Sequence, residues 1–116
     1  MRFLLMICGD GTEDVPDGMA AECAVWSAEM VRRGVLRHSV GLVRDGATAA
    51  VRVRDRQVVL GDGPFAESRE WIGGFAEIEC ADLDAAVEIA AGHPLARHAV
   101  IEAREVVSVK AGPDRR

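Results

Sequence analysis

The chain has 116 residues, of which 49% are hydrophobic, and its formal net charge at neutral pH is −5. This length fits one domain, here residues 1–111 followed by a short flexible tail over 112–116, and a domain of this size buries roughly two-thirds of its unfolded surface. The negative charge argues against nucleic acid as a partner, and no apolar run approaches the ~20 residues of a membrane-spanning helix.

The first predicted element is a strand over residues 2–8, whose almost wholly apolar character is typical of a central strand covered on both faces. A secretory signal is the alternative for such a start, but the apolar segment is short and runs into a polar turn rather than a cleavage site. A helix is predicted over residues 17–33 and a second strand over residues 35–42. The apolar stripe of this helix consists of Met19, Cys23, Trp26 and Met30.

A hairpin insertion comes next. Its strands are predicted over residues 49–54 and 57–61, with the turn at Asp55 and Arg56. Valine and arginine alternate along the first of these strands, so one face of the hairpin is expected to be solvated.

The second half repeats the pattern of the first. A strand is predicted over residues 71–80, a helix over residues 83–91 with Asp82 as its N-cap, and a last strand over residues 99–109. The resulting order is the split βαβ pattern of ferredoxin-like α+β folds, in which two helices cover one face of an antiparallel sheet. The other face must be covered or wetted, and covering it with a second copy predicts a homodimer that encloses a pocket.

The sequence contains three cysteines and three histidines, none with metal-binding spacing. Cys8, Cys23 and Cys80 lie in apolar stretches, and their odd number fits reduced thiols in a cytoplasmic protein. We expect neither a metal nor another cofactor. His93 follows a predicted helix C-terminus, where the helix dipole favours a cation.

Residues 62–67 read Asp-Gly-Pro-Phe-Ala-Glu, and a Gly-Gly-Phe segment follows at residues 73–75. Pro64 and its neighbouring glycines give this turn a defined shape. Together with flanking segments over nearly the whole chain, the motif resembles the DGPF-type, YCII-related proteins of bacteria. The resemblance implies a dimeric α/β barrel and an accessory regulatory role linked to extracytoplasmic-function σ factors.

Polar side chains on the predicted strands form a candidate floor for a small anionic or hydroxylated ligand. The structural alternative is that Glu77 or Glu79 simply pairs with Arg104 across neighbouring strands. With two residues of the turn added, the candidate ligand-binding residues are Phe65, Glu67, Glu77, Glu102 and Arg104.

Two functions remain open. The favoured one is a dimeric small-molecule-binding or regulatory protein. The alternative is a lyase, an isomerase or a dehydrochlorinase-like enzyme, with His98 and Asp62 as an acid–base pair. Some YCII-type relatives are proposed to use a histidine on the first helix and an aspartate just past its end. This helix contains no histidine and ends at Arg33 and Gly34, which argues against that dyad.

Overall fold

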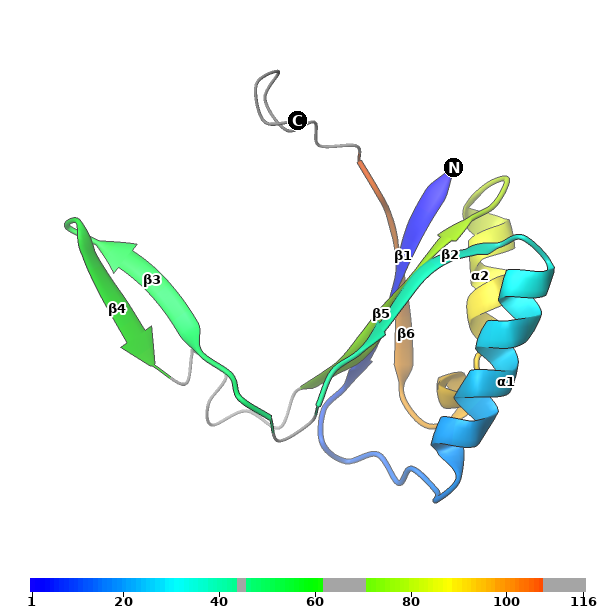
Figure 1. The fold of residues 1–116 in the computed structure, drawn as a ribbon, viewed down its shortest axis with the longest axis horizontal. Helices are drawn as coiled ribbons and strands as arrows, with labels where there is room; N and C mark the ends of the chain where they lie inside the picture. Colours follow the sequence, from blue (N-terminus) through cyan, green and yellow to red (C-terminus); the bar gives the residue numbers. More distant parts are fainter. Residues whose placement is uncertain (44–45, 62–70, 108–116) are drawn as a thin grey trace.

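The computed structural model describes residues 1–43, 46–61 and 71–107 (Figure 1). The predicted Asp62, Phe65 and Glu67 lie outside the described residues. In chain order, the elements are β1 (Arg2–Gly9), α1 (Met19–Arg32), β2 (Leu36–Gly41), β3 (Ala50–Arg54), β4 (Gln57–Gly61), β5 (Trp71–Glu79), α2 (Leu83–Ala91), the 3-10 helix η1 (Pro94–Arg97) and β6 (Val100–Glu105).

Four strands form one antiparallel sheet in the order β2-β5-β1-β6. Helix α1 connects β1 to β2, and α2 with η1 connects β5 to β6, so the two βαβ units interleave in the sheet. Both helices lie on the same side of the sheet in Figure 1. The predicted α+β class, antiparallel sheet and paired helices are therefore confirmed.

The hydrophobic core lies between the helices and the sheet. Phe3, Leu5 and Ile78 are its largest fully buried side chains, and they come from alternate positions on β1 and β5. Trp26 and Met30 on α1 pack against them, as the helical spacing predicts. This packing uses only one face of the sheet.

In the single chain, the helices cover only one of the two faces of β1. Phe3 and Leu5 point to the helices and are buried, whereas Leu4, Met6 and Cys8 point the other way and are only half-buried. Because both helices lie on one side, the apolar run of β1 leaves an apolar row on the opposite side.

The hairpin β3–β4 pairs within itself, in a separate two-stranded sheet. Its turn falls at Asp55 and Arg56, as predicted, and both residues have positive φ (48° and 66°), which is typical of a tight hairpin turn. The hairpin projects from the body on the side of the sheet opposite the helices (Figure 1). The radius of gyration is accordingly 16.6 Å, above the ~13 Å of a compact domain of this length.

His93 does not act as an exposed cation at a helix end. It is 6% exposed, its ring lies 4.6 Å from that of Trp26, and its Nδ1 accepts a hydrogen bond from the Leu95 amide. Burial lowers the pKa of His93, so the neutral imidazole is favoured. Packing of α1 against the chain after α2 thus outweighs the helix dipole.

Candidate functional site

The sheet face turned away from the helices is the first part of the candidate site, and we call it the open face. Its members follow from the strand register, because directly paired residues point to the same side of a sheet. Leu4 is paired with Glu77 on β5 and with Arg104 on β6. The described residues of the open face include Leu4, Met6, Cys8, His38, Val40, Phe75, Glu77, Val100, Glu102 and Arg104.

Three of the residues predicted to bind a ligand therefore share this face, but the predicted ion pair between Glu77 or Glu79 and Arg104 is wrong. Strand β1 lies between β5 and β6 and keeps these residues two strands apart. Arg104 instead binds Glu102 on its own strand.

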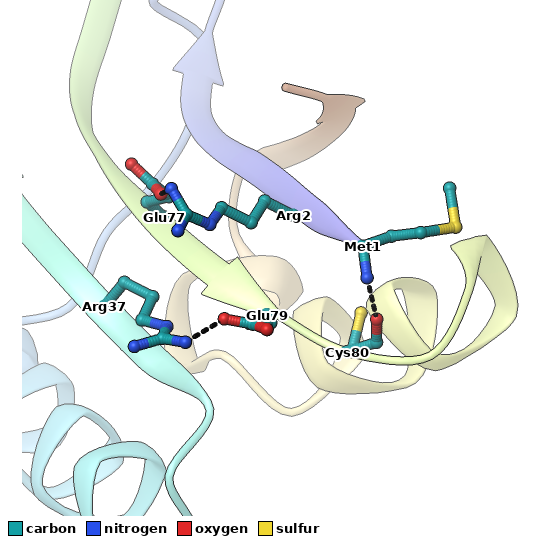
Figure 2. Close-up of polar contacts among 6 residues, drawn as sticks. All are labelled: Met1, Arg2, Arg37, Glu77, Glu79 and Cys80. Atoms are coloured by element: carbon teal, nitrogen blue, oxygen red, sulfur yellow. Dashed lines mark hydrogen bonds and ion pairs between the residues drawn. The ribbon is translucent and has the colours of Figure 1, made fainter. Parts of the chain in front are cut away.

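The acidic residues of β5 have other partners. Arg2 contacts Glu77 at 3.5 Å, and Arg37 contacts Glu79 (Figure 2). The Arg37 guanidinium lowers the pKa of Glu79. All these pairs are partly exposed, so each contributes little to stability. They pair the acidic residues of β5 with arginines.

A pocket of about 1070 Å³ lies at one end of the open face. Cys8, Val100 and Glu102 of the open face form one wall. Residues 41–43 and 46–48 line another part of the pocket, between β2 and the hairpin. The start of β5 and the loop after β1 complete it. Among the described residues that were predicted for the site, Glu102 lines this pocket.

Glu13 and Trp71 organise the inner corner of the pocket. The Glu13 carboxylate accepts hydrogen bonds from the Asp10 amide at 2.7 Å, from the Gly11 amide at 3.0 Å and from Trp71 Nε1 at 3.0 Å. These bonds lower the pKa of Glu13, with the Asp10 amide as the largest cause. The loop after β1 is thereby attached to the start of β5. The Glu13 carboxylate stays ionised at neutral pH. We call this group the Glu13–Trp71 corner.

Two glycines allow the Trp71 ring to lie where it does. A Cβ atom at Gly9 would come within 2.5 Å of the indole and 2.6 Å of the Glu13 carboxylate. A Cβ atom at Gly73 would come within 2.5 Å of the same ring. Any side chain at either position would displace the indole, so these glycines hold the corner in shape.

Asp10 adds a second carboxylate to the pocket lining. Thr12 donates to Asp10 Oδ1 through its hydroxyl at 2.5 Å and its amide at 2.9 Å. These bonds lower the pKa of Asp10, and the Thr12 hydroxyl makes the largest contribution. With Glu13 and Glu102, the pocket has three acidic residues, and no described lining residue is basic.

Cys8 lies in the pocket wall but is not poised as a nucleophile. Burial raises the pKa of its thiol, and the negative charge of Glu102 raises it further. The thiol is therefore protonated at neutral pH, and the thiolate is the reactive form. Cys8, Cys23 and Cys80 are all free and half-buried.

His98 follows η1 and is half-buried, but it is not among the described residues that line the pocket. Its predicted acid–base partner, Asp62, lies outside the described residues. Over residues 1–43, 46–61 and 71–107, no group of three or more histidines, cysteines and acidic residues is arranged to hold a metal ion. In the same part of the chain, no helix is long and apolar enough to cross a membrane.

Sequence reasoning did not identify Asp10, Glu13 or Trp71 as site residues. The hydrogen bond from Trp71 to Glu13 joins residues 58 positions apart, and no local pattern indicates such a contact. The sequence contains one signal for this corner, which is the pair of strand glycines Gly9 and Gly73. A glycine inside a strand can mark the close approach of another group, here the Trp71 ring.

Comparisons with known proteins show the family to which the chain belongs. The uncharacterized protein R00369 of Rhizobium meliloti (strain 1021) is 40% identical over 60 residues, which make up 52% of this chain. The aligned part spans 48% of that protein, so the similarity concerns about half of its length. The family model of the YCII-related domain matches residues 1–110. Because this match covers nearly the whole sequence, the chain belongs to the YCII-related domain family.

Proposed function

We propose that the protein is a homodimer that binds a small molecule in the pocket at the Glu13–Trp71 corner. The observation that carries this proposal is a preorganised corner at the end of an uncovered apolar sheet face. The indole and carboxylate are held by hydrogen bonds before any ligand arrives. Such preorganisation is typical of binding sites, because it reduces the entropy lost on association.

The open face supports the proposed dimer. Leu4, Met6 and Phe75 form an apolar patch on a sheet whose helices all lie on the other side. A second copy of the same face is a self-complementary cover, as in most symmetric homodimers. Two open faces packed together form the dimeric α/β barrel that the family resemblance implies.

The chemistry of the pocket favours a ligand with hydrogen-bond donors over an anionic one. Its described charged residues are Asp10, Glu13 and Glu102, and all three are acidic. Arg104 binds Glu102 and so does not provide a free cation to the floor. The Glu13 carboxylate is an acceptor of hydrogen bonds, from the Asp10 and Gly11 amides and from Trp71 Nε1, so a donor group on a ligand suits it better than an anion does. We therefore propose a hydroxylated or cationic ligand with an apolar part that stacks on Trp71.

The biological role that accompanies this proposal is an accessory one in the cytoplasm, in line with the σ-factor link implied by the resemblance. Acid–base catalysis by His98 and Asp62 has less support, because His98 is absent from the described pocket lining. A thiolate mechanism at Cys8 is disfavoured by the raised pKa of the thiol.

Tryptophan fluorescence tests ligand binding directly, because Trp71 lines the pocket whereas Trp26 is buried in the core. A panel of hydroxylated, cationic and anionic metabolites is titrated into the wild-type protein. We expect a saturable change for a hydroxylated or cationic compound, together with a raised thermal midpoint. In the Trp71→Phe variant, the fluorescence change should disappear while the protein remains folded by circular dichroism.

Two results would contradict the proposal. If the fluorescence change persists in the Trp71→Phe variant, the ligand binds elsewhere. If only anionic compounds bind, the acidic lining of the pocket does not determine the ligand.

A further inference from the structure

The hairpin β3–β4, which we call the arm, exposes apolar side chains on a structure that has little support of its own. A two-stranded hairpin is at best marginally stable in water. The described arm strands pair only with each other, and every residue of β4 is exposed. The arm therefore needs another surface to pack against.

One face of the arm is entirely apolar. The strand register pairs Val51 with Leu60 and Val53 with Val58, and directly paired residues share a face. These four side chains are between 58% and 67% exposed. Arg52, Arg54, Gln57 and Val59 belong to the opposite face. Exposed apolar residues concentrated on one side mark a contact surface.

In this conformation, the arm does not pack against the four-stranded sheet of its own chain. The arm projects away from the body, on the same side of the sheet as the open face (Figure 1). A second copy docked on the open face occupies the space beside the arm. By two-fold symmetry, each arm then reaches the other copy.

Charge supports the same partner. Residues 50–61 contain three arginines and one aspartate, whereas the whole chain has a net charge of −5. The arm is thus locally basic and the rest of the chain is acidic. A second copy offers an acidic body to each basic arm, which favours mutual exchange.

Resting on the proposed dimer, we propose that the two copies exchange arms, with the apolar face of each arm packed against the other copy. The exchange bears on the ligand site, because residues 46–48 at the base of the arm line the pocket. The partner that holds the arm therefore fixes one wall of the pocket. Binding of the small molecule and association of the two copies are coupled through this wall.

Neighbouring valines on opposite faces of β4 provide a matched pair of variants. Val58→Asp places a charge on the apolar face, and Val59→Asp places the same charge on the other face of the same strand. Both residues are exposed, so neither change disturbs the core. Sedimentation velocity over a range of concentrations gives the dimer dissociation constant. We expect Val58→Asp to raise it at least tenfold, about 1.4 kcal/mol, and Val59→Asp to change it much less.

Amide hydrogen exchange over residues 50–61 provides a second measurement on the wild-type protein. We expect the arm amides to be protected at concentrations where the dimer forms and to exchange rapidly on dilution to monomer. Protection that is equally strong in the diluted monomer would show that the arm packs on its own chain and would overturn the exchange.

The outcomes separate this inference from the proposed function. A wild-type protein that is monomeric at every concentration would overturn the dimer and the exchange together. A wild-type dimer that is weakened equally, or not at all, by the two variants would overturn the exchange alone and leave the open-face dimer standing.

Discussion

At the scale of single residues, the two tryptophans have different surroundings and different roles. Trp26 is 7% exposed and packs in the core beside the His93 ring. Its Nε1 is buried without a hydrogen-bond partner among the described residues. Trp71 lines the pocket, and its Nε1 donates to Glu13. One indole thus supports the fold, and the other shapes the site.

Burial of His93 predicts a pH dependence of stability. The pKa of His93 in the folded chain lies below the ordinary value of 6.5. Just below pH 6.5, the unfolded chain therefore binds a proton at His93 more readily than the folded chain does. Because the unfolded state then holds more protons, the free energy of unfolding should fall as the pH drops below 6.5. The lowered carboxylate pKa values of Asp10 and Glu13 act only at more acidic pH, below ~4.

Urea unfolding at a series of pH values tests this expectation. The His93→Asn variant keeps a side-chain acceptor for the Leu95 amide but cannot titrate, so its stability should vary less over the same range. The His98→Asn variant, which retains His93, is the matched control for the loss of one histidine. An unchanged slope in His93→Asn would show that this histidine is not the titrating group.

The residues of the site were harder to predict than those of the core. Helical spacing on one face indicated Trp26 and Met30 as core residues, because burial of a helix stripe follows from local sequence. The Glu13–Trp71 corner depends on a contact between distant parts of the chain, which local sequence does not encode. Glu102 was predicted, since strand alternation places it on the open face.

At the scale of elements, α2 illustrates how local signals define a helix. Asp82 accepts a hydrogen bond from the Ala85 amide at 2.9 Å and caps the N-terminus, and Gly92 follows the last residue. The predicted range of residues 83–91 matches the observed helix, because both ends are marked by residues that act within one turn.

Removal of this cap should destabilise the fold measurably. Asp82→Ala leaves the Ala85 amide without its side-chain acceptor and is expected to cost about 1 kcal/mol in the free energy of unfolding. Asp84→Ala is the matched control, because Asp84 lies in the first turn but is not the cap, and its loss should cost only about 0.3 kcal/mol. Equal losses in denaturant unfolding would contradict a capping role.

The strands were predicted less completely than the helices. The turn of the hairpin and its strand bounds follow from sequence, but the direction in which it projects depends on its attachment to the body. For β1, an apolar run indicated a central strand correctly, yet it could not show that the helices cover only one face. The same limit explains why the pairing of Glu77 with Arg104 failed, because sequence alone did not place β1 between their strands.

At the scale of the whole molecule, the proposed dimer is tested by two valines with the same exposure. Val100 on the open face and Val31 on α1 are each 60% exposed. Val100→Asp should shift the sedimentation coefficient towards that of a monomer, because it places a charge in the proposed interface. Val31→Asp lies on the helix side and should leave association unchanged. Dissociation by both variants, or by neither, would count against the open face as the interface.

The place of β1 in the sheet also affects how the chain folds during its synthesis. Its hydrogen-bonded neighbours, β5 and β6, begin at Trp71 and Val100, so an emerging chain offers β1 no partner until most of it has left the ribosome. Such distant pairings give a high contact order and slow folding. The apolar first strand is therefore exposed to chaperones, or to other nascent chains, for longer than any later segment.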